Sequence, residues 1–448
     1  MNKKLNKKSD KSLKFPLLFH LFIFSVVSGI TSCVWKDLNF HSPSSSLSTK
    51  VESEFFTPIV MYVLAAPIPV KGSDGVYHLV YNLIVNNANN SPWQISSIEI
   101  LSADSVEQQD QNYVFASLTG DEVTEKMQLL GARTPTNKLE PGQGGVVFID
   151  FTIKNKEQIP STIKHMITLT VPGGIPPQLA HLLELKSNEL TEIGGFTEVV
   201  LENPVVLGVP LEGVGWVAAN GCCDSLHVRA LLPINGGIHL TQRFAIDWVK
   251  LNEENRLFIG NINNVNSFFG YGQKVLAVAD ARVVTVVDKF KDQIPGEIST
   301  DNITFAEIDG NHIVLDLGNG QYAFYAHLKP KSIKFKEGDY VKKGDVIALL
   351  GNSGNTSAPH LHFHVISSPL ILGSNGLPYV LDKFNLVGST TQEALDEGME
   401  DHTPFDGEKN GEIVEGTPLK VIKASNPGTH KNELPLNLSI VTFPDSKK

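Results

Sequence analysis

Hydrophobic and polar residues alternate along much of this chain, which is the pattern of half-buried β-strands. Between residues 55 and 206, short alternating runs are separated by turn-forming segments rich in Asn, Gly and Pro. The clearest runs cover residues 77–85, 95–101, 145–153 and 165–171. Strands at this spacing predict a β-sandwich-like domain over residues 55–206. It shows no clustered catalytic set, so we expect a positioning or recognition module.

A second strand-rich region covers residues 211–368, and none of its segments has a convincing helical period. Residues 313–317 and 322–328 flank the turn Gly318-Asn319-Gly320, which predicts a β-hairpin. Residues 369–448 are more mixed and are interpreted as a C-terminal extension, with a helix near 391–400 and a last strand near 434–443. The fold class expected for the chain is therefore all-β.

The N-terminus has the pattern of an export signal over residues 1–32. Six lysines precede an apolar run at 15–30, which is too short to favour a membrane-spanning helix. The run ends at Ile30-Thr31-Ser32-Cys33, which resembles a bacterial lipobox and implies that Cys33 is lipidated. A plain secretory signal or an uncleaved anchor is the alternative. The Ser-rich residues 33–54 are expected to be a flexible tether, and the protein a cell-envelope lipoprotein on the periplasmic face of a bacterial membrane.

Charge and cysteine content narrow the function classes. The formal net charge is −11 and the body of the chain carries no basic stripe, which argues against nucleic acid as a partner.

Besides Cys33, the chain has only the neighbours Cys222 and Cys223. Adjacent Cα atoms lie about 3.8 Å apart across a trans peptide, below the usual disulfide separation of about 4.4–6.8 Å. We therefore expect two buried small hydrophobic residues and no disulfide framework.

A row of histidines follows residue 359. Because side chains alternate faces on a strand, His360, His362 and His364 are expected on one face and the three apolar residues between and after them on the other. Imidazole is a common zinc ligand, and a catalytic zinc site needs about three protein ligands and a water. The row therefore suggests a metal site, with an exposed strand face that happens to carry histidines as the alternative.

Three signatures in order resemble those of the lysostaphin/LytM-type zinc metalloendopeptidases. They are Asp247, the segment Tyr325-Ala326-His327-Leu328 and the segment Pro359-His360-Leu361-His362-Phe363. The Gly-rich residues 338–354 resemble the β core of that family, and the resemblance covers roughly residues 216–365. It implies a LytM-type β-sheet/barrel-sandwich (duplicated hybrid motif) domain over residues 211–368. It also implies Zn²⁺ as cofactor and peptide cross-links of peptidoglycan as substrate.

Carried over residue by residue, the resemblance makes Asp247 and His362 zinc ligands, and His327 and His360 the catalytic pair beside a zinc-bound water. An imidazole titrates near pH ~6.5, so one ring can take a proton from that water and return one to the leaving amine. A second, protonated ring can stabilise the oxyanion. The alternative for His327 is a structural histidine on a half-buried strand.

The first metal ligand departs from the family pattern. The family's usual His, four residues before the Asp, is replaced by Arg243, which has no lone pair to offer a metal. The nearest candidate is His239, although a straight strand would place it roughly 26 Å from Asp247, so the chain must bend. His227 is the second candidate. Sequence reasoning favours His239 over His227 and predicts His239, Asp247 and His362 as the metal ligands.

Two functions compete on these observations. The first is an envelope-anchored zinc endopeptidase, with peptidoglycan peptides and, through its lipid, the membrane as partners. The second is a catalytically inactive LytM-type factor that binds the cell wall or activates a separate wall hydrolase. Arg243 favours the second reading, and retention of Asp247 and three histidines favours the first. A biotin or lipoyl carrier is disfavoured because the Gly-rich core displays no Lys at the tip of an apolar hairpin.

Overall fold

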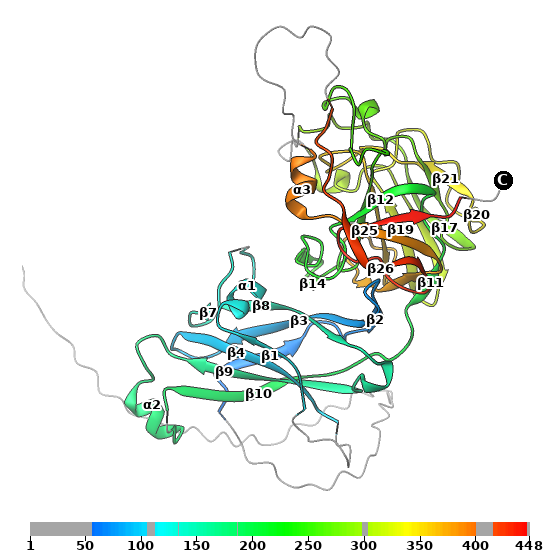
Figure 1. Cartoon of the computed structure of the whole chain (residues 1–448). Helices are drawn as coiled ribbons and strands as arrows, with labels where there is room; N and C mark the ends of the chain where they lie inside the picture. The colour runs from blue at the N-terminus through cyan, green and yellow to red at the C-terminus, as the bar shows by residue number, and fades with distance from the viewer. Residues whose placement is uncertain are drawn as a thin grey trace, which may run out of the picture. The chain divides into compact units, whose positions relative to one another are not determined.

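The structure is a computed structural model that describes residues 56–104, 113–132, 134–185, 187–297, 303–399 and 415–445. Strands dominate these ranges (Figure 1), and the three α-helices in them are short: α1 (Asp121–Lys126), α2 (Pro177–Leu182) and α3 (Gln392–Glu397). The predicted signal, Cys33 and tether lie outside the described residues. Within the described ranges, none of the helices has the length and apolar content needed to cross a membrane.

The N-terminal part is built from two five-stranded sheets. One sheet has the order β1-β3-β8-β6 with β2 against β3, and the other has the order β10-β9-β4-β5 with β7 against β4. The apolar faces enclose one buried cluster that includes Leu79 and Ile167. The strands are β1 (Ile59–Val63), β2 (Val70–Lys71), β3 (Tyr77–Asn87), β4 (Trp93–Ser102), β5 (Val114–Thr119), β6 (Met127–Leu129), β7 (Lys138–Leu139), β8 (Gly144–Ile153), β9 (Thr162–Thr170) and β10 (Glu189–Glu198).

Strand β3 is buried on both faces. Alternate residues such as Leu79 and Leu83 point into the sandwich core. The residues between them, including Val80 and Ile84, belong to buried clusters that also contain Val228 and Leu240 from the second half of the chain. The outer face of this sheet is therefore a packing surface.

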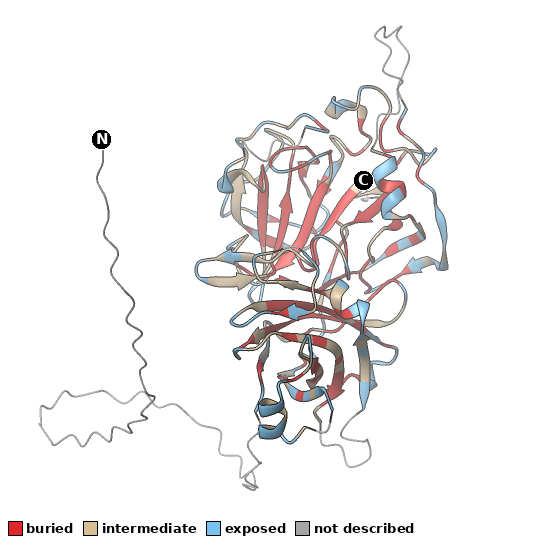
Figure 2. Ribbon diagram, turned by 90° about the vertical axis from the view of Figure 1, so that its left-hand side faces the viewer, coloured by how far each residue is buried: buried red, intermediate tan, exposed pale blue. Residues whose placement is uncertain are grey.

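The second half of the chain is organised on an eleven-stranded sheet with the order β20-β17-β18-β19-β22-β15-β12-β27-β25-β26, and β23 against β22. Buried residues concentrate on its central strands (Figure 2). The strands are β12 (Gly213–Ala219), β15 (Ile246–Lys250), β17 (Ala281–Val287), β18 (His312–Gly318), β19 (Gln321–Ala326), β20 (Tyr340–Val341), β22 (Leu361–Ile366), β23 (Gly376–Leu377), β25 (Phe384–Ser389), β26 (Ile422–His430) and β27 (Ser439–Phe443).

Three two-stranded sheets complete the described strands. They pair β11 (Val205–Leu207) with β24 (Tyr379–Leu381), β13 (Leu232–Ile234) with β14 (Gly237–His239), and β16 (Lys274–Leu276) with β21 (Val346–Leu349). The all-β fold class is confirmed. The hairpin predicted at Gly318-Asn319-Gly320 joins β18 to β19. Strands β25, β26 and β27, from the segment interpreted as an extension, join the large sheet.

Candidate metal centre

Four neighbouring strands of the large sheet bring together the predicted site residues other than His239. Strand β22 lies between β19 and β15, with His362 opposite both Ala326 and Asp247. His327 comes directly after β19. On the far side of β15, Ala219 of β12 is opposite Asp247. Because these strands are hydrogen-bonded neighbours, residues from distant parts of the sequence meet where the four strands begin or end.

The alternation along β22 separates two faces as the sequence predicts. Leu361, Phe363 and Val365 belong to the main core cluster. On the opposite face, His362 Nε2 lies 2.9 Å from His364 Nδ1. All five residues are buried. The apolar face holds the strand in the core, and the opposite face presents the imidazoles.

The carboxylate of Asp247 is the centre of the group. His362 Nδ1 lies 2.8 Å from its Oδ1, His360 Nε2 lies 3.4 Å from the same atom, and His227 Nε2 lies 3.3 Å from its Oδ2. Asn220 Nδ2 donates to Oδ2 at 2.8 Å. Burial acts to raise the pKa of Asp247, but the facing rings of His227 and His360 outweigh it and hold the pKa well below the usual range.

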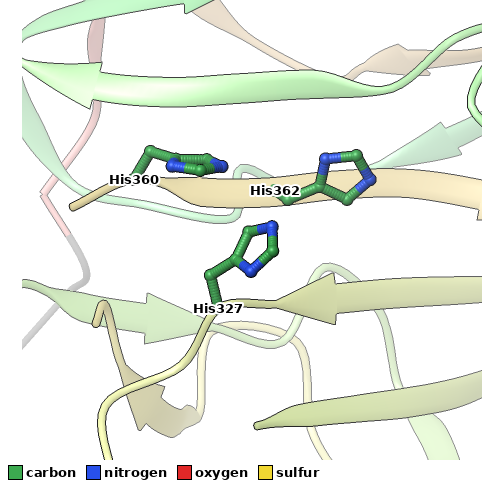
Figure 3. A group of neighbouring side chains, drawn as sticks. All are labelled: His327, His360 and His362. Atoms are coloured by element: carbon green, nitrogen blue, oxygen red, sulfur yellow. The ribbon is translucent and has the colours of Figure 1, made fainter. Parts of the chain in front are cut away.

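Two sets of ligand atoms, each with members within 4.8 Å of one another, share His362. One set is His227, Asp247 and His362, and the other is His327, His360 and His362. Figure 3 shows the second set: His362 lies on β22 with His360 just before that strand, and the ring of His327, which follows β19, points towards them. The ring centroids of His327 and His360 are 4.7 Å apart.

Backbone carbonyls fix the tautomers of three of these rings. His227 Nδ1 lies 3.2 Å from the carbonyl oxygen of Ala245. His327 Nδ1 lies 2.8 Å from the carbonyl oxygen of Ser353, and His360 Nδ1 lies 2.8 Å from the carbonyl oxygen of Ala358. Because a carbonyl oxygen can only accept a hydrogen bond, each Nδ1 must carry the proton. Each neutral ring therefore presents the lone pair of its Nε2 to the centre.

The two predicted catalytic histidines have opposite electrostatic surroundings. Burial, reinforced by the nearby rings of His360 and His362, holds the pKa of His327 well below its usual value. Burial also acts to lower the pKa of His360, but the Asp247 carboxylate raises it above the usual value. The arrangement favours one neutral and one protonated imidazole side by side.

His327 has a left-handed backbone conformation with φ 59°, which is uncommon for a residue with a side chain. Its backbone N–H donates to the Asp309 carbonyl oxygen at 3.2 Å, and the following residue, Leu328, donates to that of Asn311 at 2.9 Å. Such conformations persist where the surroundings over-determine them. Here the loop after β19 is held so that its imidazole projects towards β22.

The structure does not bring His239 to this centre. His239 lies on β14, opposite Leu232 in the β13–β14 hairpin, and its buried Nδ1 has no hydrogen-bond partner among the described residues. His227, on the loop between β12 and β13, takes the place beside Asp247. The predicted preference for His239 is therefore corrected. The loop between β12 and β13 brings His227 to Asp247, whereas His239 is held in the β13–β14 hairpin.

Arg243 faces away from the proposed ligands. Its guanidinium is buried, and Nη2 donates to Asn82 Oδ1 of β3 at 2.8 Å. Burial lowers the pKa of Arg243 to about 10. The residue that stands where the family has a metal ligand thus contacts the N-terminal sandwich.

The centre lines a cleft on the described surface. Its two sides come from the loop that carries His227 and from the segments around Ile308 and Asn355. The lining side chains are Gln128, Asn220, Leu226, His227, Arg229, Ala230, Gln242, Asp247, Ile308, Asp309, His327, Asn355, Thr356, Ser357, His360 and His362. The predicted Asp247, His327, His360 and His362 all line this cleft.

Sequence reasoning assigned no role to three residues that support the centre. Asn220 holds Asp247, the carbonyl of Ser353 orients His327, and His364 contacts His362. The period-two spacing of His364 from His362 was the one available signal among them. The other two contacts depend on long-range loop packing that has no local sequence pattern.

Cys222 and Cys223 are joined by a disulfide across a cis peptide bond, with their Cα atoms 3.0 Å apart. The expectation of two unbonded cysteines, which assumed a trans peptide, is wrong, although both residues are buried as expected. Cys223 lies near His78 and Asp150. His78 is already engaged by Asp74 at 3.1 Å and Asp150 at 3.3 Å, so this second group is an ion-pair cluster.

Comparison with known proteins concerns chiefly the second half of the chain. Residues 263–370 match the model of Peptidase family M23. The peptidoglycan DD-endopeptidases ShyA and ShyB of Vibrio cholerae serotype O1 are each 40% identical over 57 residues, which is 13% of this chain and 13% of the relative. The catalytic domain of the antimicrobial peptidase lysostaphin from Staphylococcus simulans is 22% identical, with 36% of this chain and 88% of that chain covered and a TM-score of 0.21.

Proposed function

We propose that this chain is a zinc-dependent endopeptidase that hydrolyses peptide bonds in peptidoglycan cross-links, because residues 263–370 match the model of Peptidase family M23. The substrate class is supported by the two Vibrio cholerae relatives, which are peptidoglycan DD-endopeptidases. The proposed metal ligands are His227, Asp247 and His362, and the proposed catalytic residues are His327 and His360.

One observation carries the metal proposal. His227 Nδ1 lies 3.2 Å from the Ala245 carbonyl oxygen and its Nε2 lies 3.3 Å from Asp247 Oδ2, so in the neutral form of the ring Nε2 is an acceptor that faces a second acceptor. His362 Nδ1 lies at 2.8 Å from the other oxygen of the same carboxylate. Two acceptors in a buried site repel unless a cation or proton lies between them. Two imidazole nitrogens and one carboxylate oxygen match the ligand set of catalytic zinc sites with an open position.

Zinc held by these groups would polarise the scissile carbonyl and lower the pKa of a water at the site. His327 and His360 would then carry out the proton transfers. Each presents Nε2 to the cleft with Nδ1 anchored on a backbone carbonyl. The neutral ring of His327 can accept a proton from the attacking water, and a protonated His360 can donate to the developing oxyanion or the leaving amine.

The envelope location remains a proposal from the N-terminal sequence. A lipid on Cys33, followed by the Ser-rich tether of residues 33–54, would hold the enzyme beside the cell wall that it cuts. Metabolic labelling with a palmitate analogue, compared between wild type and Cys33→Ala, tests the anchor. Labelling of both forms, or of neither, would contradict it.

Digestion of purified, DD-cross-linked peptidoglycan by the detergent-solubilised full chain tests the enzyme proposal. Wild type should release uncross-linked peptides detectable by mass spectrometry, and His360→Ala or a chelator should abolish release. The exposed His181→Ala is the matched control and should retain activity. If wild type binds the wall, releases nothing and stimulates a separate wall hydrolase, the inactive-factor alternative replaces the enzyme.

A further inference from the structure

The loop of residues 220–231, between β12 and β13, carries one proposed metal ligand and contacts the N-terminal sandwich on both sides of that ligand. We propose that the sandwich positions His227, so that metal affinity depends on contacts between the sandwich and this loop. The inference rests on the proposed function, because it takes His227 as a ligand. It assigns a role to the sandwich domain and makes Lys126, Asn82 and Arg243 positioning residues.

His227 differs from the other two proposed ligands in how it is supported. Asp247 and His362 lie on adjacent strands and are paired directly in the register of β15 with β22. His227 lies on a loop outside that ladder. A ligand on a loop needs outside contacts to keep its donor atom in place, whereas strand ligands are fixed by the sheet.

Ion pairs from the sandwich hold the loop close to His227 on both sides. Lys126, the last residue of α1, lies 2.7 Å from Asp224 Oδ2. Asp224 in turn accepts from Arg229 Nη2 at 2.9 Å and from its Nε at 3.0 Å. Arg229 Nη1 donates to the backbone carbonyl of Glu125 at 2.9 Å, and its guanidinium lies 5.5 Å from the ring centre of Phe148 on β8. The loop is thereby fastened three residues before and two residues after the ligand.

A second connection reaches the acceptor that orients the His227 ring. Asn82 on β3 accepts a hydrogen bond from Arg243, and both side chains are buried, at 1% and 4% exposure. Two residues after Arg243, the Ala245 carbonyl accepts from His227 Nδ1 at 3.2 Å. A guanidinium buried in this way must keep its partner, since burying it unpaired is costly. The Asn82 contact therefore restrains the segment that fixes the ring.

Apolar packing joins the same two parts. Ile84, Val146 and Phe148 on the outer face of the sandwich sheet form one buried cluster with Leu240, and Leu231 packs against it. Leu231 is the last residue of the loop. Asn82 lies on the same face of β3 as Ile84, so its hydrogen bond with Arg243 is buried beside this apolar cluster, where hydrogen bonds are stronger than in water.

The test measures zinc dissociation constants of the detergent-solubilised full chain by competition with a fluorescent chelator. Lys126→Ala, which removes a partly exposed ion pair, should weaken zinc binding by up to about fivefold, and Asn82→Ala, which leaves the buried Arg243 without this partner, by about tenfold. Lys126→Arg, which keeps the charge beside Asp224, should restore affinity. Lys138→Ala is the matched control, because it removes a lysine ion pair elsewhere in the sandwich.

A double-mutant cycle distinguishes positioning from general destabilisation. In a His227→Ala background, Lys126→Ala should cause no further loss of zinc affinity, because the residue it positions is gone. Unchanged affinity in Lys126→Ala, with affinity lost in His227→Ala, would overturn this inference and leave the proposed function intact. An equal loss with and without His227 would also overturn it. A wild-type chain that binds no zinc would remove both proposals. Should Asn82→Ala not fold, the Lys126 series alone decides.

Discussion

The Nε2 atom of His227 lies 3.3 Å from Oδ2 of Asp247, on the side of the carboxylate opposite to His362. Under the proposed function, His227 takes the part of the histidine that the resemblance would place at Arg243, and the number of proposed protein ligands stays at three. Because the three atoms lie within 4.8 Å of one another, the departure at Arg243 does not by itself remove the metal site.

Gly310 is predicted to be essential for placing His327. It has φ +58°, and a Cβ built on it would lie 2.2 Å from the backbone oxygen of Ser353, the atom that orients the His327 ring. Gly310→Ala should lower the free energy of unfolding by about 2–4 kcal/mol, because the backbone must shift. Urea unfolding measures the change in stability, and peptidoglycan digestion measures the effect of a displaced His327 on hydrolysis.

Gly318→Ala is the matched control for Gly310. It also has a positive φ, of +83°, but a Cβ there has nothing within 4 Å. It should cost about 1 kcal/mol and leave hydrolysis unchanged. Equal destabilisation by the two substitutions would show that the approach to Ser353 does not matter.

His364 is predicted to orient His362. Its Nδ1 lies 2.9 Å from His362 Nε2, and burial holds the pKa of His364 well below its usual value, so the ring is neutral and its Nδ1 can accept in the tautomer that is protonated on Nε2. Accepting from Nε2–H leaves the Nδ1 of His362 free for a metal. His364→Phe should weaken zinc binding about tenfold. His364→Asn, whose amide oxygen can accept near the position of Nδ1, should keep most of the affinity. The reverse order in a chelator competition would contradict the role.

Glu192 should make the sandwich less stable as the pH rises. The carboxyl group of Glu192 is buried. Burial raises the pKa to about 8 from 4.5, with the Ile59 backbone N–H acting in the opposite direction. The folded carboxyl therefore keeps its proton at pH values where the unfolded one has lost it. The stability that the protonated Glu192 contributes is fully present below pH 4.5 and is lost progressively as the pH rises to about 8.

Glu192→Gln should remove that dependence. The variant should be more stable than wild type by about 2–3 kcal/mol at pH 7 and about equally stable near pH 4.5. Thermal unfolding across this range measures the difference, with Glu198→Gln, an exposed carboxylate on the same strand, as control. A stability difference that does not change with pH would contradict the assignment.

The sequence predicted the elements of the site better than its assembly. Period-two alternation identified β3, β4, β8 and β9 and the face that carries His362 and His364, because local burial determines it. Family signatures identified Asp247, His327 and His360. The path of the loop that carries His227 could not be predicted, since it depends on contacts such as Lys126–Asp224 between residues far apart in sequence. The preference for His239 rested on its nearness to Asp247 in sequence, which does not determine nearness in the fold.

Bound metal in three forms of the full chain tests the central claim most directly. Wild type, His227→Ala and His239→Ala would be purified in parallel, equilibrated with zinc, freed of excess ion and assayed by mass spectrometry for zinc per chain. The account predicts about one zinc in wild type and in His239→Ala, and little in His227→Ala. Retention of zinc by His227→Ala together with its loss from His239→Ala would contradict the assignment of the metal centre.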